Sequence, residues 1–343
     1  MLIGLICDGN PGIGACELLA AALNRCGAEV TLICSVRPHN KNLGWLPLGP
    51  REAAASDLLH SFAAVGVFLE GDLVAILPKL HQQAAALRQR DPVFLFSGPI
   101  RPLCGDALNA DLLERLNYDL LCLQGDMQAN QLQWLLRGTP HEHKPISTIG
   151  LWCLPTRPVG HRQNQQPLLV VLDQPHTPPS PLANAFLYER LCNAARNSPS
   201  WQIRLQPDGP LSADPSQWPE TSICWHHFHD QRPPANVQRG QPEELEWAVA
   251  QASSCLGLGS DWLLSAVVWG KSTAVLGDYG IRTEFNGPVF FGSGLMHRLA
   301  DCLPLDQKLP ALPAANPGWL DDLGWSIADG PQRLLRQVVK CLP

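Results

Sequence analysis

The chain has 343 residues, 45% of them hydrophobic and 16% charged, and this length exceeds what a single hydrophobic core usually accommodates. We therefore expect two folded domains. The formal net charge is −6 and the 25 lysines and arginines are scattered, which argues against nucleic acid or an anionic membrane surface as a partner.

The first half of the chain alternates buried strands with helices. Leu2 to Cys7 reads as a buried strand, and an apolar helix is expected from Ala15 to Cys26 after a glycine-containing turn. Further strands, most of them followed by a helix, are expected at residues 29–34, 65–69, 93–96, 120–123 and 146–151. This alternation predicts a parallel, doubly wound sheet.

The turn after the first strand, Asp8 to Gly14, stands where open α/β sheets bind their ligands. Its glycines do not follow the GxGxxG spacing, and the second strand ends in Ser35-Val36-Arg37 without an acidic residue. The lysine of a P-loop is also missing. The turn therefore predicts neither a dinucleotide cofactor nor a P-loop nucleotide.

A second series of strands and helices follows the polar, proline-bearing segment 155–167, which we interpret as an interdomain linker. Strands are expected at residues 168–172, 201–205, 223–228, 254–258 and 272–276. Helices are expected at residues 184–197, 243–251, 262–269, 296–303 and 331–341. The second half is thus expected to repeat the α/β architecture of the first.

Residues 252–281 combine a strand, a tight turn, a helix and a second strand. Gly257 and Gly259 free the backbone of the turn for close approach to a ligand. Ser260 is placed where a helix would begin, with Asp261 in its first turn. Free N–H groups at a helix N-terminus bind phosphate, so the turn is a candidate phosphate site, and a plain serine cap is the alternative.

Two sets of motifs in this chain resemble known families. The second half resembles bacterial GT-B glycosyltransferases at Pro242-Glu243-Glu244-Leu245, residues 250–254, Gly259-Ser260, Leu264, Ala266 and Gly270-Lys271. Most of the chain also resembles a family of bacterial proteins known only as glycosyltransferases of uncharacterised substrate. The matching motifs are Ser97-Gly98, Arg115, Asp119-Leu120-Leu121, Ile149-Gly150-Leu151, Gln206-Pro207, Asp278-Tyr279-Gly280-Ile281, Asn286 and Gly292-Ser293-Gly294-Leu295.

The resemblance implies an α/β fold of two Rossmann-like domains that face each other across a cleft, which is the GT-B architecture. Residues 1–154 would form the acceptor-side domain, 155–167 the linker, 168–330 the donor nucleotide domain and 331–343 a C-terminal helix. The implied activity is metal-independent transfer of a sugar from a nucleotide-sugar to a carbohydrate or lipid-linked acceptor, without a further cofactor.

The resemblance also implies site residues at the carboxyl ends of the strands. A base from the N-terminal domain would deprotonate the acceptor hydroxyl, and its candidates are Asp8 first, then Asp106 and Asp126. For Asp8 the alternative is a turn residue that accepts hydrogen bonds from its own loop. The acceptor-side loops would contain Gly9, Asn10, Gly12, Gly14, Ser97 and Gly98. The donor-binding candidates are Gln174, His176, Thr177, Gln206, Gly259, Ser260, Asp261, Asp278 and Tyr279.

The chain departs from the resembled pattern in two places. Leu264 and Ser265 stand where the pattern carries a glutamate, and Gln206-Pro207 replaces a His-Pro pair. A catalytically inactive nucleotide- or sugar-binding protein on the same scaffold is therefore an alternative. A nucleotide-sugar epimerase on this scaffold is another.

The 12 cysteines are spread singly, without a CxxC pair, and most fall in apolar runs. This is typical of reduced core cysteines in a cytoplasmic protein. The N-terminus lacks the charged region of a signal peptide, and no apolar run reaches the roughly 18 residues of a membrane span. His226, His227 and His229 would point to different faces of a strand, so no metal site is expected there, nor at His141 and His143.

Overall fold

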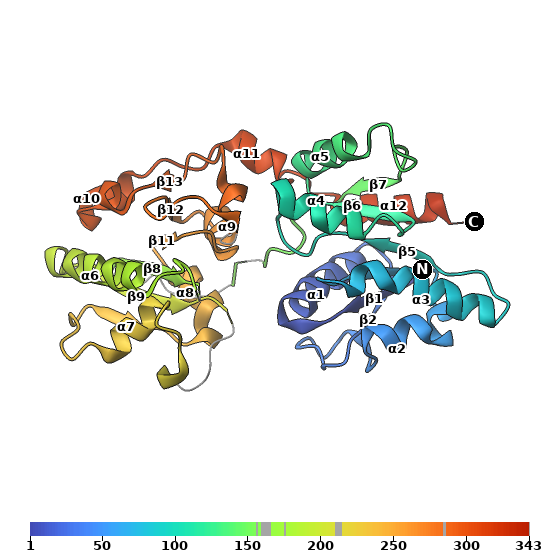
Figure 1. Cartoon of the computed structure of the whole chain (residues 1–343), viewed down its shortest axis with the longest axis horizontal. Helices are drawn as coiled ribbons and strands as arrows, with labels where there is room; N and C mark the ends of the chain where they lie inside the picture. The colour runs from blue at the N-terminus through green and yellow to red at the C-terminus, as the bar shows by residue number, and fades with distance from the viewer. Residues whose placement is uncertain (156, 159–165, 175, 210–214, 284–285, 343) are drawn as a thin grey trace. The chain divides into compact units, whose positions relative to one another are not determined.

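The computed structural model describes the chain except residues 156, 159–165, 175, 210–214, 284–285 and 343 (Figure 1). The side chains of Asn10 and Pro11 are also outside the description. The chain forms two compact units: Met1–Pro155 with Pro317–Pro343 is unit 1, and Thr156–Asn316 is unit 2. Each unit contains one parallel sheet with helices, so the expected pair of Rossmann-like α/β sheets is confirmed. Most of the expected linker lies outside the described residues.

Unit 1 is built on a seven-stranded sheet in the order β3-β2-β1-β4-β5-β6-β7, with every pairing parallel. From β1 the chain winds outward through β2 and β3, and it then returns to the other side of β1 at β4. The carboxyl ends of β1 and β4 are therefore the switch point, where crossovers leave a space for ligands. The strands are β1 Leu2–Cys7, β2 Glu29–Ile33, β3 Gly44–Leu46, β4 Ala64–Phe68, β5 Phe94–Ser97, β6 Leu120–Leu123 and β7 Ile146–Thr148.

Helices cover both faces of this sheet (Figure 1). One buried cluster joins β1 and β2 to Leu19 of α1 and Leu334 of α12, while another joins β4 and β6 to Val74 of α3 and Leu112 of α4. Strands buried on both faces carry the continuous apolar runs seen in the sequence. The helices are α1 Gly9–Arg25, α2 Pro50–Ala55, α3 Leu73–Leu87, α4 Gly105–Glu114, α5 Asp126–Leu136, α11 Pro317–Asp322 and α12 Gly330–Cys341.

The C-terminal segment belongs to unit 1, so the expected domain boundary at residue 330 moves to residue 316. Leu334 and Val338 form the buried stripe of α12, and this stripe packs in the cluster that contains α1. The backbones approach so closely that a Cβ on Gly330 would lie 2.0 Å from the carbonyl oxygen of Ile149. The sequence shows that α12 is amphipathic, but periodicity does not say which sheet its apolar stripe covers.

Unit 2 is built on a six-stranded parallel sheet in the order β10-β9-β8-β11-β12-β13. Its switch point lies between β8 and β11. The strands are β8 Leu168–Asp173, β9 Gln202–Pro207, β10 Val237–Arg239, β11 Ser254–Gly257, β12 Ser272–Leu276 and β13 Met296–His297. The helices are α6 Pro181–Asn197, α7 Ile223–His229, α8 Leu245–Gln251, α9 Trp262–Val268 and α10 Leu305–Lys308.

Residues 223–228, expected as a strand, form α7 instead. Ser222 caps this helix by accepting a hydrogen bond from the Trp225 N–H. The buried Asp173 carboxylate accepts the N–H groups of Ile223 and Cys224 as well. Because Asp173 lies about fifty residues upstream, on β8, this tertiary cap leaves no local signal in the sequence.

One other expectation needs correction. Residues 296–303, expected as a helix, form β13 and a 3₁₀ helix at Leu299–Cys302. The short strands β3 and β10 are not among the expected strands. Lys271 follows Gly270 and reaches the C-terminus of α8, where its Nζ donates to the carbonyls of Ala250 and Ala252 at 2.7 Å each.

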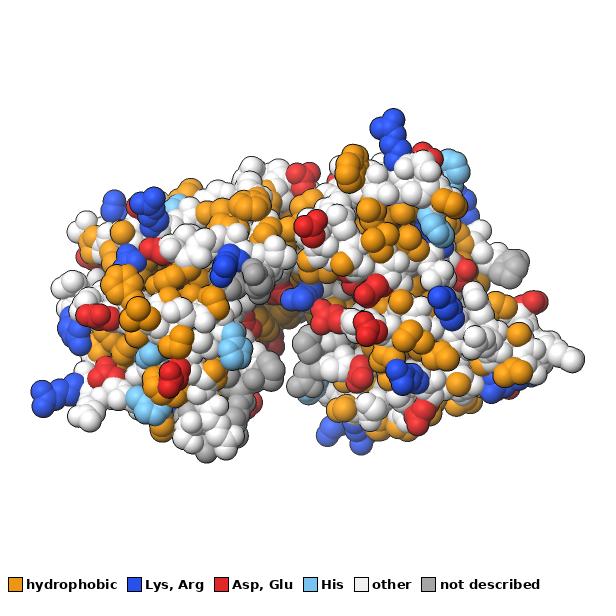
Figure 2. Space-filling view, in the orientation of Figure 1, with side chains coloured by type: hydrophobic (Ala, Val, Ile, Leu, Met, Phe, Trp, Pro, Cys, Tyr) orange, Lys and Arg blue, Asp and Glu red, His pale blue; other side chains and the backbone are white. Residues whose placement is uncertain are grey.

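Charged side chains of both signs are interspersed on the face of the molecule that Figure 2 shows, without a block of lysines and arginines there. Within the described residues, none of the helices combines the length and hydropathy that crossing a membrane requires.

We predict that Gly330→Ala loosens α12 and lowers the melting temperature by about 5 °C or more, because the added Cβ meets backbone that cannot move away. Gly14→Ala is the matched control: apart from its chain neighbours and its own helix backbone, no heavy atom lies within 4 Å of its Cβ position, and alanine favours a helix more than glycine does. Thermal unfolding of both variants measures the difference. Equal melting temperatures would contradict the docking of α12 on unit 1.

Candidate functional site

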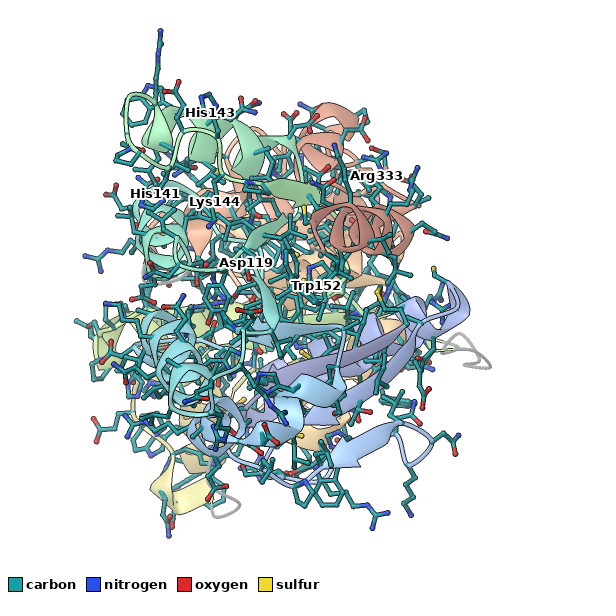
Figure 3. All side chains as sticks on the ribbon, turned by 90° about the vertical axis from the view of Figure 1, so that its right-hand side faces the viewer. Asp119, His141, His143, Lys144, Trp152 and Arg333 are labelled. Carbon is teal, nitrogen blue, oxygen red and sulfur yellow. The ribbon has the colours of Figure 1, made fainter. Side chains whose placement is uncertain are left out.

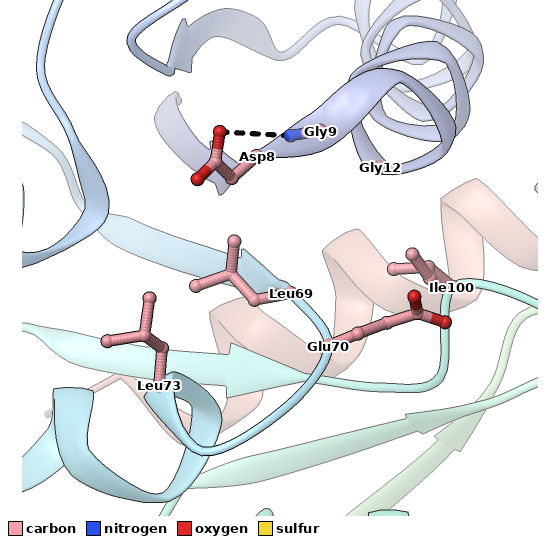
Figure 4. A pocket seen from close by; sticks show the side chains of 7 residues that line it. All are labelled: Asp8, Gly9, Gly12, Leu69, Glu70, Leu73 and Ile100. Atoms are coloured by element: carbon pink, nitrogen blue, oxygen red, sulfur yellow. Dashed lines mark hydrogen bonds between the residues drawn. The ribbon is translucent and has the colours of Figure 1, made fainter. Parts of the chain in front are cut away.

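Unit 1 has a cavity of about 240 Å³ at its switch point. The cavity lies at the carboxyl ends of β1 and β4, where the strand order reverses. Its walls come from the end of β1, the first turns of α1, the segment after β4 and the loop after β5. The lining residues are Asp8, Gly9, Gly12, Leu69, Glu70, Leu73 and Ile100 (Figure 4).

Asp8 follows β1 directly and extends its carboxylate into this cavity (Figure 4). One carboxylate oxygen accepts the N–H of Gly9 at 2.9 Å, which caps α1. The side chain is exposed, so a ligand in the cavity can reach it. Both sequence interpretations of Asp8 are therefore compatible with its position, since it accepts a local hydrogen bond and also faces the cavity.

Helix α1 begins at Gly9 and not at Ala15 as expected. Gly9 has φ 67°, a left-handed conformation that glycine adopts without strain, and this lets the helix start immediately after the strand. Gly9 and Gly12 line the cavity from the first turns of α1, whereas Gly14 does not. The side chain of Asn10 lies outside the described residues. Glycine has a low helix propensity, so the sequence analysis interpreted Gly9, Gly12 and Gly14 as part of a turn before the helix.

Glu70 is the acidic residue that the sequence analysis did not select. It comes two residues after β4, and its carboxylate lies 3.0 Å from Nε of Arg101. Figure 4 shows Glu70 beside Ile100, so carboxylates from two neighbouring strand ends line one cavity. The sequence could have indicated Glu70 by its position alone, because Glu70 comes shortly after a buried strand, as Asp8 does.

Asp106 and Asp126 do not line the cavity. Both are exposed and lie in the first turns of α4 and α5, where a negative charge favours the helix dipole. Their interaction with the helix dipoles accounts for their charge, and neither residue lies in the cavity with Asp8.

Ser97 and Gly98 belong to the packing that holds the strand ends together. The Ser97 hydroxyl donates to the Val67 carbonyl and accepts a hydrogen bond from the fully buried Arg115 at 2.6 Å. Arg115 also donates to the Leu69 carbonyl at 2.8 Å and pairs with Asp111. A Cβ on Gly98 would lie 1.9 Å from the carbonyl oxygen of Cys122, so only glycine fits. These residues position the segment after β4 and do not line the cavity.

In unit 2, Gln174, His176 and Thr177 follow β8 at the switch point. Oε1 of Gln174 is buried and has no hydrogen-bond partner among the described residues. His176 is exposed at φ 64°, with Nδ1 2.9 Å from Oγ1 of Thr221. Thr177 is buried and its N–H donates to the Gln174 carbonyl. Oε1 of Gln174 has almost no accessible surface, so exposed His176 is the side chain of this group that a ligand at this edge can reach.

Ser260 is almost fully buried, and its hydroxyl is used inside the fold. It accepts the Trp262 N–H at 3.1 Å and bonds the carboxylate of Asp208, which follows β9. Helix α9 begins at Trp262, so Ser260 lies two residues before the helix. Asp261 accepts a hydrogen bond from Nδ2 of Asn286 at 2.6 Å. The side chains of Ser260 and Asp261 are thus engaged inside the fold, and the backbone near the buried Gly259 stays a candidate phosphate contact.

The remaining donor-binding candidates make contacts within unit 2. Nε2 of buried Gln206 donates to the Gln241 carbonyl at 2.7 Å. Asp278 pairs with Arg190 at 2.8 Å, and the Tyr279 hydroxyl donates to the Ala183 carbonyl at 3.4 Å.

Histidines do not assemble a metal centre within the described part of the chain, where no group of three or more His, Cys, Asp or Glu is arranged to hold an ion. His227 on α7 contacts the hydroxyl of Tyr188 instead. His141 and His143 lie on the segment before β7, near Lys144, with Asp119 directly before β6 (Figure 3).

Two parallel, doubly wound sheets with polar strand ends define a protein of two Rossmann-like α/β units. The family described as "Putative glycosyltransferase (DUF6716)" matches residues 53–339, and the chain belongs to that family. The expected resemblance to glycosyltransferases is thereby confirmed. No curated protein matches this chain in sequence.

Several solved structures share the fold at low sequence identity. UDP-GlcNAc 2-epimerase from Neisseria meningitidis bound to UDP-GlcNAc has a TM-score of 0.60 at 12% identity, over 99% of this chain and 100% of that one. The glycosyltransferase of kitacinnamycin has a TM-score of 0.55 at 12% identity, over 100% and 99%. The lipopolysaccharide outer core galactosyltransferase WaaB has a TM-score of 0.53 at 11% identity, over 99% of each chain.

Burial raises the pKa of Asp208 to about 6, against the hydrogen bond from Ser260, and nearby Asp173 raises it further. An unfolded aspartate titrates near pH 3.9. The free energy cost of ionising Asp208 in the folded state therefore grows from about pH 4 to pH 6 and is fully present above that range.

We predict that Asp208→Asn raises the melting temperature at pH 8 and leaves it unchanged at pH 4. Glu189→Gln, an exposed carboxylate on α6, should change neither value. A constant difference for Asp208→Asn at both pH values would contradict the assignment.

Proposed function

We propose that the protein transfers a sugar from a nucleotide-sugar donor to an acceptor hydroxyl and that Asp8 is the general base. The observation that carries this proposal is the exposed carboxylate of Asp8 in the switch-point cavity of unit 1. A carboxylate can accept the hydroxyl proton as the new glycosidic bond forms, provided that the acceptor binds within hydrogen-bond reach.

Glu70 gives the cavity its second carboxylate, and Leu69, Leu73 and Ile100 give it apolar walls. Glu70 is paired with Arg101, so we assign it to orienting the acceptor through hydrogen bonds rather than to proton transfer. Asp8 carries no such ion pair among the described residues, which favours Asp8 as the base.

We assign donor binding to the carboxyl edge of unit 2. Support comes from exposed His176 and from the glycines before Ser260. Close backbone approach near Gly259 suits a diphosphate. The Neisseria epimerase of similar fold is bound to UDP-GlcNAc, which makes a UDP-sugar the first donor to test. The proposal invokes no metal and no cofactor, and the 12 unpaired cysteines favour the cytoplasm as the compartment.

A nucleotide-sugar epimerase is the second candidate. It is favoured by the two carboxylates, Asp8 and Glu70, in one cavity and by the fold similarity to the epimerase. The two functions differ in their need for an acceptor: an epimerase interconverts the donor sugar alone, whereas a transferase releases nucleotide as the sugar moves.

We predict that Asp8→Asn lowers sugar transfer about 10²- to 10⁴-fold while the melting temperature stays the same. The amide oxygen can still accept the Gly9 N–H, so the cap of α1 is kept while the base is lost. Nucleotide release from UDP-, GDP-, dTDP- and CMP-sugars, with candidate acceptors, measures the rate.

Asp106→Asn and Asp126→Asn are the matched controls, because both replace exposed helix-start carboxylates outside the cavity. Their rates should equal that of the wild type. Full activity of Asp8→Asn would refute its role as base, and sugar interconversion without any acceptor would favour the epimerase.

A further inference from the structure

The switch-point cavity of unit 1 has walls of two kinds. Leu69, Leu73 and Ile100 form an aliphatic wall (Figure 4). The polar side chains among its described lining residues are the carboxylates of Asp8 and Glu70. The ligand of this cavity must therefore match an apolar surface and polar side chains that, when ionised, only accept hydrogen bonds.

The aliphatic wall is continuous with the folded core. Leu69 is 3% exposed and Ile100 is 8% exposed, and each belongs to one of the two buried clusters of unit 1. Leu73, at the start of α3, packs against the cluster that contains Leu69. Such a wall cannot turn away from a polar ligand, so a hydroxyl pressed against it would lose water without gaining a partner. A polyol with hydroxyls all round its ring is therefore a poor match.

The charge of the cavity disfavours an anionic ligand. Nε of Arg101 lies 3.0 Å from the Glu70 carboxylate and offsets its charge, whereas Asp8 has no ion pair among the described residues. The positive end of α1 would attract an anion, but Asp8 already caps it through the Gly9 N–H. A phosphate or carboxylate on the ligand would thus meet the uncompensated negative charge of Asp8.

We propose that the acceptor is an uncharged alcohol on an apolar skeleton, and neither a carbohydrate nor a phosphorylated compound. This class rests on the proposed function, in which the acceptor hydroxyl donates to Asp8. The hydrocarbon next to that hydroxyl packs on the aliphatic wall, and the volume of about 240 Å³ is enough for a six-membered carbon ring. In the transfer, the alcohol oxygen bonds the anomeric carbon of the sugar and its proton passes to Asp8, while the nucleotide leaves with the electron pair of the broken bond.

The test uses three probes built on the same six-membered carbon ring: cyclohexanol, myo-inositol and myo-inositol 1-phosphate. Their dissociation constants for the full-length wild-type protein are measured by ligand-observed NMR. We expect cyclohexanol to bind about tenfold more tightly than myo-inositol, and the phosphate to bind most weakly. Tighter binding of myo-inositol or of its phosphate, or no binding of cyclohexanol, would overturn the proposal.

Two leucines of α3 locate the bound probe. Leu73→Asn places an amide of similar size in the aliphatic wall and should raise the Kd of cyclohexanol about three- to tenfold. Leu87→Asn is the matched control, because Leu87 ends the same helix, is 87% exposed and does not line the cavity. It should leave the Kd unchanged. The same Kd in both variants would place cyclohexanol elsewhere and overturn the assignment.

Glu70→Gln tests the charge with a gain of binding, which a misfolded protein cannot produce. It removes one negative charge and frees the guanidinium of Arg101, whose side chain is 49% exposed. The Kd of myo-inositol 1-phosphate should therefore fall several-fold, while that of cyclohexanol stays the same. A Kd for the phosphate that does not fall would contradict the role of charge in selecting the acceptor.

The acceptor class and the proposed function fail in different ways. If myo-inositol binds more tightly than cyclohexanol while sugar transfer still depends on Asp8, the acceptor class is wrong and the proposed function stands. If cyclohexanol binds through Leu73 while Asp8→Asn keeps full transfer, the cavity keeps its ligand class and the assignment of the base is wrong.

Discussion

The reversal of strand order between β1 and β4 is the constraint on which the account of unit 1 depends. Because β2 and β4 flank β1 and their crossovers cover opposite faces, a cavity stays open at the carboxyl ends of β1 and β4. Asp8 caps α1 at that point through the Gly9 N–H, and the cap fixes the direction of its carboxylate. The same hydrogen bond thus starts the helix and orients the proposed base, so Asp8 can serve as a helix cap and as a base at the same time.

Most residues that carry the family resemblance prove to be connectors within the fold. Arg115 and Ser97 join the ends of β4 and β5, and Asp119 accepts the Leu95 N–H at 2.7 Å. Gln206 and Asp278 have similar structural partners in unit 2. Buried polar groups need well-defined partners, so such residues make recognisable motifs even where they touch no ligand. A motif that identifies the family is therefore a poor guide to which side chain meets the substrate.

The sequence predicted the two parallel sheets because strands buried on both faces leave long apolar runs, as at β1 and β8. It also indicated that Asp8 lies at the carboxyl edge of the sheet, since a polar residue directly after a buried strand marks that edge. It missed what depends on distant contacts: the cap of α7 by Asp173, the docking of α12 on unit 1 and the place of Glu70 in the cavity that Asp8 also lines. Ser260 illustrates the same limit, because its burial against Asp208 cannot be read from its own turn.

The most direct test of the central claim is a crystal structure of the protein with a non-reactive nucleotide-sugar and an acceptor bound. The account predicts the reacting hydroxyl of the acceptor within about 2.6–3.2 Å of the Asp8 carboxylate. An acceptor bound elsewhere, with Asp8 contacting only the Gly9 N–H, would contradict it.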